Sequence, residues 1–263
     1  MLIPDKLIQQ KPFLGKKALV VGGTGGIGKA VALGLAERGA ELTVHGGSSK
    51  ERLESTLKAI KEKGGKGEGF LLSINSPSCA GEILRLAPPP DMLVCAWGPF
   101  ERSAIVGMNG ELWQKMADFN LVFPGFLVSS VLKGMIEKNW GRILLFGGTN
   151  TGTIRGFQTT TAYSASKTAL GVIAKSVAAS VAALVATAGV AQTAGGPDIT
   201  CNVLCPGLTD TEYTPENLRQ YNREKSPGGE PLTPEQIADA AIAILENPLI
   251  NGAIIPADKG LVI

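Results

Sequence analysis

A short apolar run leads into a glycine-rich segment in Ala18-Leu19-Val20-Val21-Gly22-Gly23-Thr24-Gly25-Gly26-Ile27-Gly28. A helical pattern follows over Ile27–Arg38. A short apolar run bounded by turn residues is typical of a buried strand. Glycine permits the positive φ that a sharp turn needs, and the free N–H groups at the start of a helix bind anions such as a pyrophosphate. The stretch therefore predicts a strand, a phosphate-binding turn and a helix, the first unit of a dinucleotide-binding α/β fold.

The remainder of the chain repeats this alternation of apolar runs with helical patterns. Two of the helical patterns are long: one has apolar residues from Leu112 to Met135, and the other begins near Tyr163. Strands separated by helices predict a parallel sheet covered on both faces. No linker or repeat divides the chain, so residues 1–263 are predicted to form a single doubly wound Rossmann-type α/β domain with about seven strands. The predicted strands are 18–21, 41–45, 69–74, 92–96, 143–146, 199–204 and 253–256, and the shorter helices are 27–38, 49–63 and 78–86.

Charge and histidine content exclude several classes of function. The 263 residues carry a net charge of +2, from 25 basic and 23 acidic side chains, so neither nucleic acid nor a membrane surface is an expected partner. The sole histidine, His45, excludes a Ser-His-Asp triad and a multi-histidine site, and no metal is expected. The uncharged stretch 176–197 is long enough to cross a bilayer. Its many Ala, Ser, Thr, Gln and Gly residues instead favour a buried or subunit-facing helix followed by a loop.

The cysteines fit neither a disulfide framework nor a paired CxxC metal site. We expect reduced, buried thiols, which agrees with a cytoplasmic location. No signal peptide is predicted, because Pro4 and Asp5 interrupt the apolar residues near the start of the sequence. The four cysteines are Cys79, Cys95, Cys201 and Cys205.

Tyr163 and Lys167 are the leading candidates for acid–base chemistry. They are four residues apart at the start of a predicted helix, so their side chains should share one helix face. An unperturbed tyrosine has a pKa of about 10, too high for efficient proton transfer at neutral pH. A neighbouring lysine cation stabilises the phenolate, so we expect Lys167 to lower the pKa of Tyr163.

Asn120 is a third candidate, for a reason that lies in the helix backbone. Pro124 follows it by four residues, and proline has no N–H to donate to the carbonyl of Asn120. That free carbonyl could bind a water in a proton relay if it faces Lys167. A simple kink of an interface helix at Pro124 is the alternative.

These motifs together resemble the short-chain dehydrogenase/reductase family, in particular its 3-oxoacyl-carrier-protein reductase-like members. The resemblance rests on the spacing of Gly22, Gly26 and Gly28, on the Tyr163/Lys167 pair and on the segment Cys205-Pro206-Gly207-Leu208-Thr209-Asp210-Thr211. It implies an NAD(P)-dependent enzyme that moves a hydride between the nicotinamide and a ketone or secondary alcohol. Tyr163 would act as the acid or base, Lys167 would also hold the nicotinamide ribose, and Asn120 would support the relay water.

The resemblance also implies a set of cofactor-binding residues. The backbone of Leu208 and the side chain of Thr211 would hold the nicotinamide carboxamide. The further members of the set are Gly22, Thr24, Gly26, Ile27, Gly28, Ser48, Lys50, Ser73, Ile74, Ala96, Gly98, Tyr163, Lys167, Pro206 and Gly207.

The end of the second predicted strand favours NADP over NAD. An NAD site usually has an acidic residue there for the ribose 2′-hydroxyl, but the chain reads His45-Gly46-Gly47-Ser48-Ser49-Lys50. The Ser48 hydroxyl and Lys50 could hold a 2′-phosphate, with Lys29 or His45 as further candidates. Lys50 could also simply begin a solvated helix.

Two ways of counting give different residues for one substrate-binding position. Counting from the strand at 143–146 places Gly148 where the family has a serine, whereas counting back from Gly152 places Thr149 there. A threonine hydroxyl makes the same hydrogen bond, so Thr149 is the preferred catalytic candidate and Asn150 the next. The change motivates an alternative function, a dinucleotide-binding sensor or scaffold with little or no turnover.

The resemblance implies two further features. Residues 212–231 would form a lid over the substrate pocket, and the two long helices would form a homodimer or homotetramer interface. The substrate would be a small carbonyl or alcohol compound. The loop at 186–197 resembles an insertion relative to the family.

Overall fold

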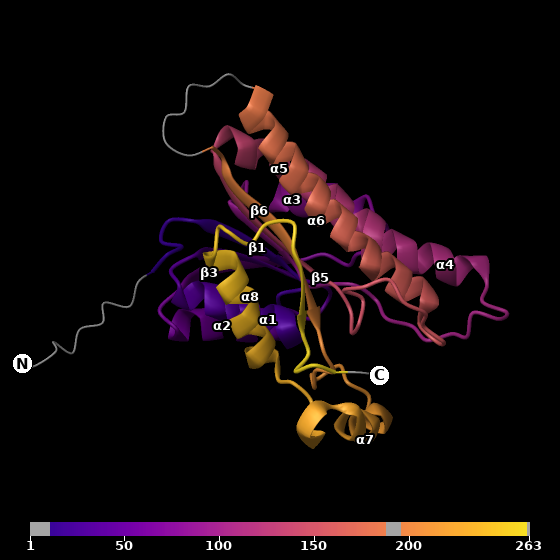
Figure 1. The fold of residues 1–263 in the computed structure, drawn as a ribbon. Helices are drawn as coiled ribbons and strands as arrows, with labels where there is room; N and C mark the ends of the chain where they lie inside the picture. The colour runs from indigo at the N-terminus through magenta and orange to yellow at the C-terminus, as the bar shows by residue number, and fades with distance from the viewer. Residues whose placement is uncertain (1–10, 188–195, 262–263) are drawn as a thin grey trace, which may run out of the picture.

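A computed structural model describes residues 11–187 and 196–261 and shows seven parallel strands in the order β3-β2-β1-β4-β5-β6-β7 (Figure 1). The chain thus winds outward in both directions from β1 and β4, which confirms the doubly wound α/β fold. In such sheets the crevice at the carboxyl ends of the two central strands is the usual ligand site. The strands are β1 Lys17–Val21, β2 Glu41–Gly46, β3 Lys66–Leu71, β4 Met92–Cys95, β5 Trp140–Phe146, β6 Asp198–Pro206 and β7 Ile254–Ala257.

Helices cover both faces of the sheet, and each face has its own apolar core. One core includes Val31 and Leu35 of α1 with Ile242 of α8, and the other includes Leu127 of α5 with Leu170 of α6. Figure 1 shows α7 apart from both layers, below the sheet. The helices are α1 Gly26–Glu37, α2 Lys50–Glu62, α3 Cys79–Leu86, α4 Gly110–Ala117, α5 Phe123–Glu137, α6 Thr161–Thr187, α7 Glu216–Lys225 and α8 Pro234–Glu246.

The register of the strands brings the predicted site residues to one edge. Val21 at the end of β1 pairs with His45 of β2 and with Cys95 of β4, and Phe146 of β5 pairs with Leu204 of β6. We call this side the carboxyl edge of the sheet. The segments that follow these strands therefore gather at this edge.

Two predicted elements differ from the structure. The third strand begins at Lys66 instead of Gly69 and ends before Ser73. As the edge strand it tolerates polar residues, so its apolar pattern misplaced it. The first long helix is interrupted by a π-helical turn, Asp118–Val122, in which the Phe123 N–H donates to the Asp118 carbonyl, five residues back. Because Pro124 lacks an N–H, the regular hydrogen-bond ladder cannot continue there.

Two helical stretches, Gly110–Glu137 and Thr161–Leu184, are long and apolar enough to cross a membrane by length and composition alone. Each also buries side chains in the core beside the sheet, including Phe123 and Leu127 of the first and Leu170 and Ala174 of the second. Partly buried core helices of an α/β domain pass the same test, so length and hydropathy here do not indicate a membrane span. All four cysteines are free and buried, as predicted.

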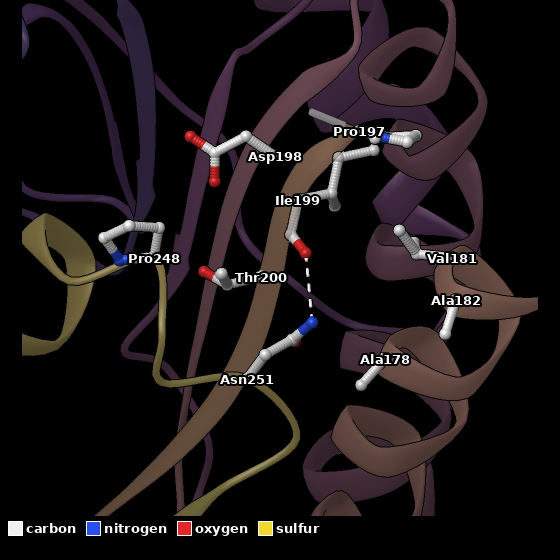
Figure 2. A pocket seen from close by; sticks show the side chains of 10 residues that line it. Ala178, Val181, Ala182, Pro197, Asp198, Ile199, Thr200, Pro248 and Asn251 are labelled. Carbon is white, nitrogen blue, oxygen red and sulfur yellow. Dashed lines mark hydrogen bonds between the residues drawn. The ribbon is translucent and has the colours of Figure 1, made fainter. Parts of the chain in front are cut away.

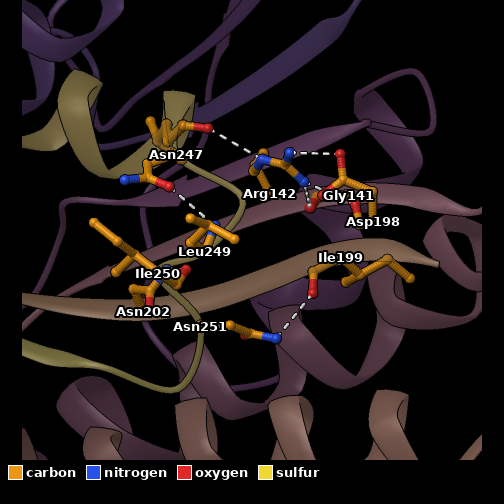
Figure 3. A network of polar contacts seen from close by, with 10 residues as sticks. Gly141, Arg142, Asp198, Ile199, Asn202, Asn247, Leu249, Ile250 and Asn251 are labelled. Atoms are coloured by element: carbon orange, nitrogen blue, oxygen red, sulfur yellow. Dashed lines mark hydrogen bonds and ion pairs between the residues drawn. The ribbon is translucent and has the colours of Figure 1, made fainter. Parts of the chain in front are cut away.

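A polar network fixes β6, the strand that leads into the Pro206–Gly207 segment (Figure 3). The buried Arg142 on β5 donates to the carbonyl of Asp198 and to its carboxylate, both at 2.7 Å. Further along β6, Asn202 Nδ2 donates to the Ile250 carbonyl at 2.7 Å, and its Oδ1 accepts from the Ala253 N–H at 2.9 Å. These bonds join β6 to β5 and to the loop before β7, and so set where β6 ends at the carboxyl edge.

Candidate active site

The glycine loop between β1 and α1 has room for backbone only. Gly22 and Gly26 have φ values of 79° and 49°. A Cβ on Gly28 would collide with the Gly22 carbonyl oxygen, and one on Gly22 would lie 2.9 Å from the Cβ of Trp97. A side chain is thus disfavoured by φ at Gly26, by sterics at Gly28 and by both at Gly22. Thr24 and Ile27 belong to the same turn, and the methyl of Thr24 packs against Gly46 at the end of β2.

His45 supports this loop from below. The Gly22 N–H donates to its Nδ1 at 3.3 Å, and its Nε2 lies 2.9 Å from the Leu72 carbonyl. The ring is neutral in this arrangement, with the proton on Nε2. Burial lowers the pKa of His45, partly opposed by the bond to Leu72. Because His45 is fully buried with both nitrogens in use, the idea that it holds a 2′-phosphate is wrong.

The N-terminus of α1 already holds an anion, and that anion belongs to the chain itself. The Gly26 N–H donates to both carboxylate oxygens of Glu212, at 3.0 and 3.1 Å. An anion at a helix N-terminus is stabilised by the free N–H groups and the helix dipole. The loop therefore fits the negatively charged pyrophosphate of a dinucleotide.

The other residues predicted to hold the 2′-phosphate, at and near the end of β2, are exposed or contact other side chains. Ser48 is exposed, Lys50 is 81% exposed and lies 3.6 Å from Glu54, and Lys29 donates to Ser55 at 3.4 Å. The side chain of Arg52, in the first turn of α2, instead reaches Tyr213 beside the glycine loop. The sequence reading missed Arg52, although its place one turn into the helix after β2 was a usable signal.

Tyr163 and Lys167 lie together at the carboxyl edge, on the first turns of α6. The Lys167 Nζ donates to the Phe146 carbonyl at the end of β5, at 2.9 Å, and lies 5.9 Å from the centroid of the Tyr163 ring. Burial lowers the pKa of Lys167 to about 8, against the opposing effects of Cys95 and Cys205. Lys167 is thus poised between its charged and neutral forms near neutral pH.

The pKa of Tyr163 moves in the direction opposite to the expectation. Burial, assisted by Cys205, raises it above its ordinary value of 10. The expected lowering by Lys167 was wrong, because removing the phenol from water disfavours the charged phenolate. The phenol is therefore held in its protonated form.

Asn120 joins this pair through the π turn. It is fully buried, and its Nδ2 donates to the Pro99 carbonyl at 3.0 Å. Its Oδ1 has no hydrogen-bond partner among the residues that the structure describes. A Cβ on Gly98 would collide with this Oδ1 and lie 3.2 Å from the Lys167 Nζ, so both polar atoms border the same small space. An unpaired buried acceptor beside an amine is a place where a water would be bound. The expected water site therefore lies at the side chain of Asn120. A relay through the backbone carbonyl of Asn120 stays a prediction.

Trp97, in the segment after β4, supports the turn that carries Asn120. Its ring packs edge-on against Phe119 and Phe123, with centroids 5.6 and 5.4 Å away. These two residues lie in and directly after the π turn that carries Asn120. Ala96 and Gly98 on either side of Trp97 face the glycine loop and Asn120 respectively.

Of the three candidates for the serine position, Gly148 is the one that lies beside the Tyr163 phenol. A Cβ there would lie 3.0 Å from the Tyr163 hydroxyl and 2.8 Å from its ring. The hydroxyl of Thr149, the preferred candidate, instead donates to the Pro206 carbonyl at 3.2 Å. Thr151, which the sequence reading did not single out, is buried and bonds both the N–H and the carbonyl of Gly148, at 2.8 and 2.9 Å.

Asn150, the other candidate, has a φ of 59°, and its buried Nδ2 has no partner. In the part of the chain that the structure describes, neither Thr149 nor Asn150 forms a side-chain hydrogen bond with Tyr163. The residue beside the phenol therefore contributes backbone alone.

The remaining predicted cofactor residues surround the same crevice. Pro206 ends β6, the Gly207 N–H donates to the Ala257 carbonyl, and the Leu208 carbonyl accepts from Leu232. The methyl of Thr211 lies 3.4 Å from where a Cβ on Gly26 would be. Ser73 is exposed just beyond β3, and Ile74 packs against the core.

Phe100 and Arg102 form a wall that the sequence reading also missed. The Phe100 ring packs edge-on against Tyr163, with centroids 4.9 Å apart. The Arg102 guanidinium lies 5.9 Å from the Phe100 ring and 5.7 Å from the ring of Tyr221 on α7. Tyr221, in the segment 212–231 that is predicted to form a lid, thus contacts the loop that flanks the candidate catalytic tyrosine.

An open cavity of about 410 Å³ lies elsewhere, between the second half of α6 and the start of β6 (Figure 2). Ala178 and Val181 line one side, and Asp198 and Asn251 line the other. It is at the opposite end of β6 from Pro206 and contains none of the candidate catalytic residues. Gly196 and Pro197 also line the cavity, and most of the insertion noted at 186–197 lies outside the described residues.

Comparisons with known proteins show the family of the chain. A family model described as short chain dehydrogenase matches residues 16–222. An uncharacterized oxidoreductase of Bacillus subtilis, YvaG, is 30% identical over 271 residues, which cover 94% of this chain and 96% of that protein. The 3-oxoacyl-[acyl-carrier-protein] reductase FabG of Pseudomonas aeruginosa is 30% identical over 259 residues, covering 94% and 97%.

Among solved structures, a 3-oxoacyl (acyl-carrier-protein) reductase from Agrobacterium tumefaciens with NADP bound has the same fold. Its TM-score is 0.84 at 24% identity, and the match covers 97% of this chain and 98% of that chain. The family match extends over most of the sequence and includes both the glycine loop and the Tyr163/Lys167 pair. The chain belongs to the short-chain dehydrogenase family of oxidoreductases, which bind a nicotinamide dinucleotide.

Proposed function

We propose that the chain is an NADP-dependent oxidoreductase, of the type that acts on the CH–OH group, with Tyr163 as its acid–base residue. The observation that carries the proposal is the grouping of Tyr163, Lys167 and the unpaired Oδ1 of Asn120 beside a glycine loop that holds an anion. FabG relatives about 30% identical support a reductase with a small carbonyl substrate.

The dinucleotide, when bound, supplies or accepts the hydride. The glycine loop at Gly22–Gly28 would hold its pyrophosphate, Lys167 its nicotinamide ribose, and Leu208 and Thr211 its carboxamide. Arg52 would hold the 2′-phosphate, because its guanidinium lies beside the glycine loop, where it bonds Tyr213, and matches phosphate geometry. This assignment favours NADP over NAD.

Tyr163 would donate its proton to the carbonyl oxygen during reduction. Burial raises its pKa, so the phenol carries the proton that this step consumes. Lys167, with a pKa of about 8, and a water beside Asn120 Oδ1 would then return a proton to the phenolate. At neutral pH the phenol is therefore in the protonated form that reduction of a ketone requires.

A dinucleotide-binding protein with little or no turnover is the second candidate, and Gly148 is the observation that favours it. Gly148 offers no hydroxyl beside Tyr163, and Thr149 bonds Pro206 instead. Loss of one donor to a reacting oxygen typically costs about 100-fold or more in rate.

NADPH oxidation across a panel of ketones, including a 3-oxoacyl thioester, tests the two candidates. Tyr163→Phe should lower turnover at least about 100-fold while NADPH still binds, because it removes only the transferable proton. Tyr221→Phe on α7 is the matched control and should keep most of the activity. Tight NADPH binding without turnover on any ketone would support the binding protein and contradict the enzyme.

We further propose a homo-oligomer formed through α5 and α6, and a cytoplasmic location. Val122, Phe126 and Val172 are exposed apolar residues on the outer side of this helical layer. Buried free thiols agree with a reducing compartment. Light scattering after size exclusion would report the oligomer, and Phe126→Glu should dissociate it.

A further inference from the structure

A tight turn from the start of the proposed lid lies on the glycine loop. This turn, Thr211–Thr214, we call the hook. The N–H of Thr211 donates to the Thr214 hydroxyl at 3.0 Å, and the N–H of Thr214 donates to the Thr211 carbonyl at 2.9 Å. Its two central residues, Glu212 and Tyr213, point their polar groups at the place where a dinucleotide would lie.

The Glu212 carboxylate replaces a cap that α1 lacks. The N-cap residue Gly25 has no side chain to cap the helix, and the first turn of α1 contains no acidic residue. Glu212, 186 positions further along the chain, instead accepts from the Gly26 N–H with both oxygens. The group most suited to receive a phosphate is therefore bound by the chain itself.

Tyr213 binds Arg52, the cation that the proposed function assigns to the 2′-phosphate. Its hydroxyl accepts from Arg52 at 2.7 Å, and the guanidinium lies 4.8 Å from its ring centroid. A Cβ on Gly25 would collide with this hydroxyl and with Glu212, and the ring edge lies 3.6 Å from where a Cβ on Gly26 would be. The hook thus covers the backbone of the glycine loop and engages Arg52 at once.

We infer that the hook competes with the dinucleotide, so that Glu212 and Tyr213 set the affinity of the chain for its cofactor. The pyrophosphate and the Glu212 carboxylate cannot both bind the Gly26 N–H, since two anions would share one donor. This inference rests on the proposed function only in requiring that a dinucleotide binds. The measured dissociation constant is then the intrinsic one divided by the fraction of molecules whose hook is open.

The lid has the parts needed to release the hook as a unit. Arg219 of α7 bonds both carboxylate oxygens of Asp210 at 2.7 Å, directly before the hook. Beyond α7, Gly228 and Gly229 both have a φ of 77°, which only glycine adopts without strain. Displacement of the hook would therefore carry α7, and with it the Tyr221 contact to Arg102, away from Tyr163.

Titration of the full chain with NADPH, followed by cofactor fluorescence, tests the competition. Glu212→Gln keeps the shape of the side chain and removes its charge, which is worth about a two- to fivefold change in binding at a helix N-terminus. The dissociation constant for NADPH should fall by that factor, and Glu212→Ala should lower it at least as much. Tyr213→Phe, which keeps the ring and removes the bond to Arg52, should change it in the same direction.

Glu235→Gln is the matched control, because it removes a glutamate from the first turn of another helix, α8. Its affinity should equal that of the unmodified protein. Hydrogen exchange at the Gly26 amide, measured without cofactor, should be faster in Glu212→Gln than in this control, which provides a readout independent of binding.

Three results would overturn the inference. One is an NADPH affinity of Glu212→Gln equal to that of Glu235→Gln, and another is weaker binding by both Glu212 variants in folded protein. Unchanged exchange at Gly26 would contradict the contact itself. If no variant binds any dinucleotide, the proposed function fails as well, which separates that failure from failure of the hook alone.

Discussion

Replacing Lys167 with methionine should stabilise the ligand-free protein at neutral pH while removing its chemistry. The Lys167 side chain is only 6% exposed, and burial lowers its pKa from 10.5 to about 8. At about 1.4 kcal/mol per pKa unit, keeping the ammonium buried at pH 7 costs about 3 kcal/mol. Methionine has a similar length and no charge, so it loses only the hydrogen bond to the Phe146 carbonyl, worth about 1 kcal/mol. A net gain of about 2 kcal/mol is expected.

The pH dependence gives this prediction its sign. The pKa in the folded state lies below the pKa in the unfolded state, so between them the unfolded chain holds a proton that the folded chain lacks. The free energy of unfolding of the unmodified protein should therefore rise with pH above about 8, by up to about 1.4 kcal/mol per unit. The stability gained when Lys167 is neutral is present in full above pH 10.5 and is lost as the pH falls through about 8.

Urea denaturation of both proteins at a series of pH values from about 7 to about 9.5 measures the effect. The advantage of Lys167→Met should shrink by about 2 kcal/mol over this range. Lys175→Met, at an exposed position on the same helix, controls for the loss of a lysine and should show no advantage at pH 7. Parallel curves for the unmodified protein and Lys167→Met, or a less stable Lys167→Met at neutral pH, would refute the reasoning.

Three further changes test the surroundings of the crevice. Gly28→Ala should destabilise the fold by about 1–3 kcal/mol and abolish NADPH binding, because its Cβ would collide with the Gly22 carbonyl. Gly47→Ala is the control: its Cβ would meet none of the described atoms within 4 Å, so melting temperature and NADPH affinity should not change. Burial lowers the pKa of His45, so below pH 6.5 the unfolded chain gains a proton before the folded chain does, and the unmodified protein loses stability. His45→Gln should lose less stability over the same pH range, and an equally steep loss would contradict this. Gly148→Ala should reduce kcat by displacing the Tyr163 ring, which lies 2.8 Å from the new Cβ, and an unchanged kcat would show that the ring position is not critical.

Several elements followed from local sequence rules. The glycine loop was readable because glycine at a strand–helix junction has few other uses, and α6 was placed because Tyr163 and Lys167 begin a long apolar period. The edge strand β3 was misplaced because pairing with β2, and not its own apolarity, decides its extent. The π turn at Asn120 was only partly foreseen: Pro124 indicated a backbone defect but not its form.

The sequence by itself determined the α/β class, the nucleotide loop and the candidate acid–base pair, because periodicity, glycine sterics and helix spacing act over a few residues. Only the tertiary structure decided which side chains surround that pair. Gly148 instead of Thr149 faces Tyr163 because the register of β5 and the bonds of Thr151 orient the turn after the strand. Glu212 reaches Gly26 across 186 positions because the carboxyl ends of β1 and β6 meet at one edge of the sheet. Contacts of that kind depend on the sum of the strand pairings, which no local pattern encodes.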